Sequence, residues 1–273
     1  MLARRNAGRS ALASIARLGR LQPRELRGPR TLEYDLVIPG LDPAHDGLKV
    51  AHLTDLHVGM LTPDRKILRA IAAAQAAKPD LVLLTGDYVC YSPKFVGRLA
   101  ELVRGISAPC YAVLGNHDYW TDGEGVRRAL ERNGYAVLRN GHSEITLRHA
   151  PLSIVGIDDA VTGHADSKRA FAGVRKQGSR IVLTHVPSIA DRAAAEGEAL
   201  ILAGHTHGGH VVIPRVTARI ARKLGSRYLA GFYRIDGSLL YVNCGIGSSS
   251  IPIRAGAPAE VAIFTLRAAA TDK

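Results

Sequence analysis

The stretch Asp-Gly-Leu-Lys-Val-Ala-His-Leu-Thr-Asp-Leu-His-Val-Gly at residues 46–59 decides the fold. It places a short apolar run, residues 48–53, immediately before two side chains that bind metals well, Asp55 and His57. An apolar run without strict alternation is typical of a strand that is covered on both faces. A carboxylate and an imidazole that follow such a strand lie at its carboxyl end, where α/β sheets form their ligand sites.

The same arrangement recurs along the chain. Further apolar runs cover residues 81–85, 111–114, 181–184 and 200–203, and amphipathic stretches typical of helices cover 63–77, 94–106, 122–133, 168–177 and 189–195. Strands that alternate with helices predict an α/β domain built in layers. We expect segments 144–147, 153–155 and 239–243 to add antiparallel strands. Thr121 and Glu124 predict a capping box where the third helix begins.

The composition is that of a globular protein in a reducing compartment. A chain of 273 residues with 47% hydrophobic content can bury one large core. Cys90, Cys110 and Cys244 are too scattered for a zinc knuckle, a redox dithiol or a disulfide framework. We interpret all three as small buried hydrophobic residues.

The net charge of +12 is concentrated at the amino terminus. In the first thirty residues only Glu25 stands against Arg4, Arg5, Arg9, Arg17, Arg20, Arg24, Arg27 and Arg30. Such a segment attracts nucleic acid, an anionic bilayer surface or an acidic partner, and charge alone does not choose among them. We expect the chain to divide into a basic leader over residues 1–31, a single domain over 32–268 and a tail over 269–273.

The leader has several interpretations. An arginine pair at residues 4–5 precedes the mildly apolar residues 11–16, as in a twin-arginine export signal, but Arg17 interrupts a run too short to span a bilayer. An interfacial helix would turn Leu12 and Ile15 toward lipid. We favour a disordered leader on a cytoplasmic protein. Peripheral contact with the inner face of the membrane is the second interpretation, and twin-arginine export is the disfavoured one.

Side chains that bind metals follow the predicted strands one after another. They are Asp55 and His57 after the first strand, Asp87 after the second, Asn116, His117 and Asp118 after the third, His185 after the fourth, and His205 and His207 after the fifth. The carboxyl ends of the strands meet at one edge of an α/β sheet. We therefore expect these residues, distant in sequence, to converge on one site.

These motifs differ in strength. Asp-Leu-His at residues 55–57 and Gly-Asp at 86–87 are common by chance, and a lone histidine such as His185 is more often a core residue than a ligand. Gly-His-Thr-His-Gly-Gly at 204–209 is stronger, because glycines flank two imidazoles and let the backbone approach a ligand closely. The occurrence of all the motifs in this order favours a metal site.

The ordered series Asp-x-His, Gly-Asp, Gly-Asn-His-Asp, His and Gly-His-Thr-His resembles the calcineurin-like metallophosphoesterase superfamily over residues 48–266. Residues 46–59, 204–209 and 241–254 are similar to the bacterial branch that contains the YkuE and YaeI phosphodiesterases. The resemblance implies a four-layer α/β sandwich of two mixed β-sheets flanked by helices. It also implies a hydrolase of phosphoric esters, in a branch that includes proteins acting on UDP-2,3-diacylglucosamine, a lipid A precursor.

The resemblance further implies a pair of divalent metal ions. Carried over residue by residue, it assigns Asp55, His57, Asp87 and His207 to the first ion, and Asp87, Asn116, His185 and His205 to the second. Asp87 then bridges the two ions. Carboxylate and amide oxygens combined with imidazole nitrogens suit manganese, iron or zinc better than calcium, and they leave the choice among these metals open.

Two more residues are implied in the chemistry. His117, beside the ligand Asn116, is expected to protonate or stabilise the leaving oxygen, and Asp118 to orient the His117 imidazole. The chain departs from its branch at His210 and Cys244, where relatives often have glutamine and arginine. Neither position is an implied ligand, so the departures bear on substrate preference and leave the chemistry unchanged.

We therefore expect a metal-dependent enzyme that hydrolyses a phosphodiester or pyrophosphate bond with metal-activated water. The substrate is expected to be a phosphorylated small molecule or a lipid-linked nucleotide such as UDP-2,3-diacylglucosamine. The alternative is a nuclease or nucleic-acid-binding protein that uses the arginine-rich leader. Nucleic acid is the disfavoured partner, because aromatic residues make up only 5% of the chain and no basic patch is interleaved with them.

Overall fold

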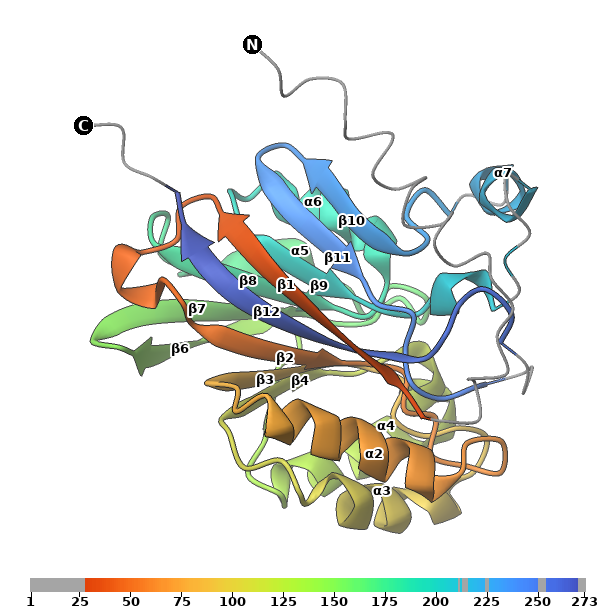
Figure 1. Cartoon of the computed structure of the whole chain (residues 1–273). Coiled ribbons are helices and arrows are strands. Elements are labelled where there is room, and N and C mark those ends of the chain that lie inside the picture. Colours follow the sequence, from red (N-terminus) through yellow and green to blue (C-terminus); the bar gives the residue numbers. More distant parts are fainter. Residues whose placement is uncertain (1–27, 211, 213–215, 224–225, 250–253, 270–273) are drawn as a thin grey trace.

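The computed structural model describes residues 28–210, 212, 216–223, 226–249 and 254–269. Two six-stranded sheets face one another at its centre, and helices cover the outer face of each sheet (Figure 1). The protein is thus a four-layer α/β sandwich of two mixed sheets, as the resemblance implied. None of the helices in the described ranges combines the length and apolar character needed to cross a bilayer.

The first sheet contains the first and the last strand of the domain together with the strands of its amino-terminal half. In spatial order its strands are β1 (Arg30–Ile38), β12 (Glu260–Ala268), β2 (Lys49–Leu53), β3 (Leu81–Thr85), β4 (Cys110–Val113) and β5 (Ala136–Val137). Strands β2 to β5 run parallel, whereas β12 pairs antiparallel with β2 and parallel with β1. The carboxyl ends of β2, β3 and β4 therefore lie at one edge of the sandwich.

The second sheet has a parallel centre and antiparallel borders. Its spatial order is β10 (Gly231–Ile235), β11 (Ser238–Val242), β9 (Leu200–Ala203), β8 (Ser179–Thr184), β7 (Ala150–Ile157) and β6 (Gly141–Leu147). β7, β8, β9 and β11 run parallel, and β6 and β10 are antiparallel edge strands. The segments predicted to be antiparallel strands are β6, β7 and β11, although β7 and β11 pair in parallel with their inner neighbours.

The helices form the outer layers. α2 (Asp64–Ala76), α3 (Val96–Val103) and α4 (Asn116–Glu131) cover the first sheet, and α5 (Ser167–Phe171) and α6 (Ala190–Ala194) cover the second. Short 3-10 turns occupy Pro43–His45, Pro93–Phe95, Pro187–Ile189 and His207–Gly209. α7 (Val216–Lys223) lies apart from both sheets, on the side of the molecule where β2 to β4 end (Figure 1).

Strand β3 shows why the apolar runs do not alternate. Leu81 and Leu83 point into the core between the two sheets, whereas Val82 and Leu84 pack against the helices of the first sheet. All five residues of the strand are buried. A strand that contacts one apolar layer on each face needs apolar side chains at every position.

The helix that follows β4 begins earlier than predicted. α4 starts at Asn116, and the Asp118 carboxylate accepts a hydrogen bond from the N–H of the residue that precedes the helix (2.9 Å). The helix kinks at Asp122, whose carboxylate accepts from the Gly125 N–H (2.9 Å). The predicted box of Thr121 with Glu124 is therefore wrong, because Asp122 caps the second part of the helix.

The predicted leader falls mainly outside the described residues, which begin at residue 28. Strand β1 starts at Arg30, within the segment that the sequence assigned to the leader. At the other end of the domain, β12 runs to Ala268 and pairs with β1 along its whole length.

His52 of β2 lies between the two sheets, directly before the residues of the metal motifs. Its side chain is fully buried, and Nε2 lies 2.8 Å from Thr85 Oγ1. The ring packs among aromatic neighbours, with its centroid 6.2 Å from that of Tyr241 and 6.5 Å from that of Phe264. Burial lowers the pKa of His52 to about 3, against the opposing charge of Asp55.

We expect His52 to make the fold sensitive to acid. The unfolded chain takes up a proton at this imidazole below about pH 6.5, whereas the folded protein keeps it neutral down to about pH 3. The stabilising contribution of the neutral ring is therefore present above pH 6.5 and is lost as the pH falls. In His52→Leu, unfolding free energy should depend less steeply on pH between about pH 6 and pH 4, by about 1.4 kcal/mol per pH unit.

Urea denaturation at a series of pH values measures this slope. His142→Leu replaces an exposed imidazole of β6 and serves as the control, for which the slope should match that of the parent. Identical slopes for His52→Leu and the parent would show that the folded state does not exclude the proton from His52.

Candidate metal centre

The predicted metal-binding residues meet at one edge of the sandwich. Asp55 and His57 follow β2, Asp87 follows β3, Asn116 begins α4 after β4, His185 follows β8, and His205 and His207 follow β9. These strands are parallel within their sheets, and the two sheets present their carboxyl ends to the same edge. Six of the seven side chains are linked by distances of 3.0 to 3.7 Å.

A first cluster consists of Asp55, His57 and His207. The Nε2 atoms of His57 and His207 face each other at 3.0 Å. Asp55 Oδ1 lies 3.7 Å from His57 Nε2 and 3.3 Å from His207 Nε2. All three side chains are buried, and their ligand atoms lie close enough together to surround one metal ion.

A second cluster consists of Asp87, His185 and His205. Asp87 Oδ2 lies 3.2 Å from His185 Nε2, which in turn lies 3.3 Å from His205 Nδ1. These three ligand atoms are also close enough to surround one ion. Asp87 Oδ2 is 3.6 Å from His57 Nε2 as well, so this carboxylate touches both clusters.

Bound cations would provide partners for oxygen and nitrogen atoms of the site. Asn116 Oδ1 is buried and has no hydrogen-bond partner among the described residues. A buried amide oxygen without a donor is costly, and a cation would satisfy it. The imidazole nitrogens that face each other within each cluster would, once deprotonated, offer lone pairs to a cation between them. The donor set of oxygen and nitrogen therefore suits a divalent transition metal.

The charges of the site are balanced internally. Burial alone would raise the pKa of Asp55, but His207, His57 and His185 hold it well below its ordinary value. Burial acts in the same direction on Asp87, and His185 and His57 lower its pKa. Burial would lower the pKa of His185, but the nearby carboxylates of Asp87 and Asp55 outweigh this effect and raise the pKa to about 10. A protonated imidazole thus offsets the carboxylates, and bound cations would displace its proton.

The backbone at the site adopts a conformation that side-chain-bearing residues rarely use. Positive φ angles occur at Asp55 (53°), His57 (46°), Asp87 (56°), His205 (71°) and His207 (50°). Each such residue costs of order 1–3 kcal/mol and persists only where its surroundings hold it. Backbone hydrogen bonds between the strand-end loops supply that support, as in His57 N–H to Asp87 O (3.0 Å).

Gly115 is required by the closeness of these loops. A Cβ atom at this position would lie 2.3 Å from Asp87 Oδ1, which is well inside contact distance. The absence of a side chain lets the start of α4 approach the Asp87 carboxylate. The neighbouring His117 N–H donates to the same Oδ1 at 2.9 Å, so α4 is fixed directly to the metal centre.

Asp118 has different partners from those predicted. The expectation was a contact with the His117 imidazole. Instead, its carboxylate accepts hydrogen bonds from the backbone N–H groups of residues 87–89 (2.9, 2.7 and 3.1 Å) and of Gly115 (2.9 Å). Asp118 therefore joins the loop after β3 to the start of α4.

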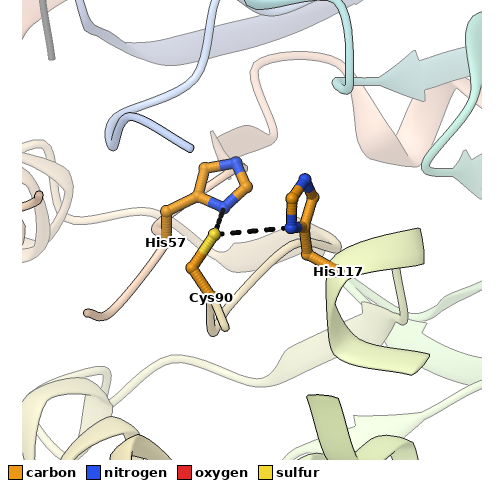
Figure 2. Close-up of side chains that lie close together, drawn as sticks. All are labelled: His57, Cys90 and His117. Carbon is orange, nitrogen blue, oxygen red and sulfur yellow. Dashed lines mark hydrogen bonds between the residues drawn. The ribbon is translucent and has the colours of Figure 1, made fainter. Parts of the chain in front are cut away.

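Cys90 belongs to the site, although the sequence suggested only a small buried hydrophobic residue. Figure 2 shows its sulfur between two imidazoles, with Sγ 3.2 Å from His57 Nδ1 and 3.4 Å from His117 Nδ1. Burial, together with the carboxylates Asp87 and Asp118, raises the pKa of the thiol to about 12. The signal available in the sequence was its place three residues after Asp87, within the loop that follows β3.

Arg254 and His210 also contact the cluster histidines. The buried Arg254 Nη2 lies 2.8 Å from His207 Nδ1, and its Nη1 donates to the Cys244 carbonyl (2.6 Å). The His210 ring stacks on that of His207, with centroids 4.5 Å apart. His210 and Arg254 thus both contact a candidate ligand, and Arg254 does so from the carboxyl-terminal part of the chain.

Apolar side chains are exposed beside the site. Met60 is 86% exposed, Tyr91 64% and Trp120 63%, and Leu61 is partly exposed in the same loop as Met60. The centroid of the His117 ring lies 5.0 Å from that of Trp120 and 6.0 Å from that of Tyr91. Tyr91 and Trp120 border the His117 ring, whereas Met60 and Leu61 follow His57 in the chain. These four residues, here called the apolar rim, are exposed side chains with an affinity for apolar groups.

A family comparison accounts for this constellation. Residues 48–209 match the family described as calcineurin-like phosphoesterase. The matched segment contains both clusters, Asn116 and His117, and it covers more than half of the chain.

Individual relatives extend over most of the chain. YkuE of Bacillus subtilis, an uncharacterised metallophosphoesterase, is 28% identical over 243 residues, which cover 87% of this chain and 85% of YkuE. The phosphodiesterase YaeI of Escherichia coli is 31% identical over 206 residues, or 73% and 75% of the two chains. The UDP-2,3-diacylglucosamine pyrophosphatase LpxG of Chlamydia muridarum is 25% identical over 275 residues, or 80% and 83%. The chain belongs to the calcineurin-like phosphoesterase family.

Proposed function

We propose that this metallophosphoesterase hydrolyses a phosphodiester or pyrophosphate bond at a centre that holds two divalent ions. The observation that carries the proposal is the position of Asp87, whose Oδ2 lies 3.6 Å from His57 in one cluster and 3.2 Å from His185 in the other. A carboxylate that touches two clusters is suited to bridge two cations. Manganese, iron and zinc all fit the oxygen and nitrogen donors.

The proposed ligands divide between the two ions. Asp55, His57 and His207 would hold the first ion, Asn116, His185 and His205 the second, and Asp87 both. When bound, the two ions lower the pKa of water and neutralise the charge that develops on the phosphoryl group. The positive φ angles at five of these residues fix the side-chain directions, so little reorganisation is needed when the ions bind.

His117 is the proposed partner of the leaving oxygen. Its backbone N–H is tied to Asp87, and its ring lies beside that of His57 with centroids 4.9 Å apart. In Figure 2 the Nε2 atoms of His57 and His117 point to the same side, away from Cys90. An imidazole in this place can donate a hydrogen bond or a proton to the oxygen that departs from phosphorus. Asp118 supports this geometry by holding the backbone on both sides.

The bridging position of Asp87 can be tested with Asp87→Asn, which removes one charge and keeps the side-chain shape. We expect the parent, reconstituted with manganese, iron or zinc after chelation, to hydrolyse bis-p-nitrophenyl phosphate faster than the monoester. The variant should lose about 100-fold or more in kcat, because a neutral amide with a single oxygen donor replaces the charged carboxylate that both ions share. Steady-state kinetics and metal analysis of both proteins measure the effect.

Asp35→Asn is the matched control, since it neutralises an exposed carboxylate of β1 that pairs with Arg267. It should retain the activity of the parent. An Asp87→Asn protein as active as the parent would remove Asp87 from the bridging position and the two-ion mechanism with it.

For the substrate, we propose a lipid-linked nucleotide of the UDP-2,3-diacylglucosamine type, cleaved at its pyrophosphate. The apolar rim supports this choice, because Trp120 beside His117 and Met60 in the loop after His57 are exposed apolar side chains that suit contact with an acyl chain. The relative LpxG is named for this activity, and YaeI is named as a phosphodiesterase. α7, with Val216 and Arg219 exposed, lies on the same side of the molecule and suits contact with an anionic membrane surface.

We expect UDP-2,3-diacylglucosamine to be split into UMP and the acylated sugar phosphate. Trp120→Ala should raise KM for this substrate by about tenfold, in line with the loss of about 1.5 kcal/mol of apolar contact. It should change KM for bis-p-nitrophenyl phosphate much less. Product formation can be followed by liquid chromatography with mass spectrometry.

Leu68→Ala, which shortens an exposed apolar side chain of α2, is the control. Intact lipid substrate alongside efficient diester hydrolysis would exclude the lipid proposal.

A further inference from the structure

Cys90 connects two histidines that face different parts of the site. Its side chain is 2% exposed, and its sulfur contacts the Nδ1 atoms of both His57 and His117, at 3.2 and 3.4 Å. The Nε2 atom of each ring points away from the sulfur (Figure 2). The thiol therefore links the ring of a proposed metal ligand to the ring of the proposed partner of the leaving oxygen.

A thiol has one proton, so it can donate to only one of these two nitrogens. His57 turns Nε2 toward Asp55 and Asp87, at 3.7 and 3.6 Å, and this is the nitrogen placed to bind a cation. A neutral imidazole that binds a cation through Nε2 carries its proton on Nδ1. In that case His57 Nδ1–H donates to Cys90 Sγ, and the Cys90 S–H can donate to His117 Nδ1.

We propose that Cys90 is a positioning residue that holds the neutral His117 ring in the tautomer with its proton on Nε2. In this tautomer the ring offers an N–H donor on the side away from Cys90, where it can bind the oxygen that departs from phosphorus. The inference rests on the proposed phosphoesterase function, because that function defines which oxygen His117 meets.

The other neighbours of His117 set the plane of its ring and do not select a tautomer. Trp120, Tyr91 and His57 all contact the ring at steep interplanar angles, of 69°, 85° and 89°. Within the part of the chain that the structure describes, the hydrogen bond of the ring is the one with Cys90. Removing the thiol would therefore allow both tautomers of His117, while the aromatic neighbours keep the ring in its position.

A cation is the competing occupant of the space among His57, Cys90 and His117. Their ligand atoms lie within 4.8 Å of one another. A third cation would require His57 to bind metal through both nitrogens and to lose both ring protons, whereas the hydrogen-bonded arrangement keeps one. The experiment distinguishes the two arrangements by counting metal ions.

The kinetic test compares two diesters with different leaving groups. p-Nitrophenolate leaves readily, whereas the more basic phenolate depends on a donor at the departing oxygen. We expect Cys90→Ala to lower kcat for diphenyl phosphate by at least about tenfold, and to change kcat for bis-p-nitrophenyl phosphate by less than about threefold. Cys90→Ser keeps a donor and an acceptor and should restore most of the loss. Cys110→Ala, which removes a buried thiol at the start of β4, should alter neither value.

The second readout is the tautomer itself, observed in ring ¹⁵N–¹H correlation spectra of the zinc-loaded protein, with the His117 signals identified by their loss in His117→Asn. The parent and Cys90→Ser should show His117 protonated on Nε2, and Cys90→Ala should show a mixture of tautomers. An unchanged tautomer in Cys90→Ala would overturn the proposal. Equal losses on both diesters, or a third metal ion that only Cys90→Ala lacks, would also overturn it. Failure of the proposed function is a separate result, because it appears in the parent as absence of metal-dependent diester hydrolysis.

Discussion

The contact of the Asp87 carboxylate with imidazoles from two sheets is the interaction on which the rest of the structure depends. Burying a carboxylate costs several kcal/mol unless charges and donors surround it. His57 and His185 provide that surrounding from opposite sheets, at 3.6 and 3.2 Å from Oδ2. Both sheets must therefore bring the carboxyl ends of their parallel strands to a common edge. The layered core and the positive-φ turns at the strand ends satisfy this requirement together.

Much of this arrangement could be predicted from the sequence, because strands covered on both faces have a distinctive composition. β3 and β9 occupy the predicted runs, Leu81–Thr85 and Leu200–Ala203. The second run is followed by a turn of unusual composition, with two histidines in residues 204–209. Parallel strands carry such turns to the same edge, so convergence followed from the order of the motifs alone.

The contacts that orient the site could not be predicted, because they join side chains to distant loops without a local pattern. Asp118 looked like the partner of its neighbour His117, yet its hydrogen bonds go to backbone N–H groups about thirty residues earlier in the chain. Cys90 has an apolar sequence context, and only the folded chain places its sulfur between two imidazoles. Arg254 reaches His207 across 47 residues. Chemical type and strand order predict ligands, whereas tertiary packing alone determines what holds them.

The division of the proposed ligands between the sheets has a consequence for the durability of the protein. Asp55, His57 and Asp87 come from the first sheet, and His185, His205 and His207 from the second. An ion bound in either position would therefore link the first sheet to the second. Binding to the native state alone adds about 2.7 kcal/mol at a hundredfold excess over Kd. A lack of metal in a cell would therefore abolish the activity and also lower the stability of the contact between the two sheets. The less stable protein would be more susceptible to proteolysis.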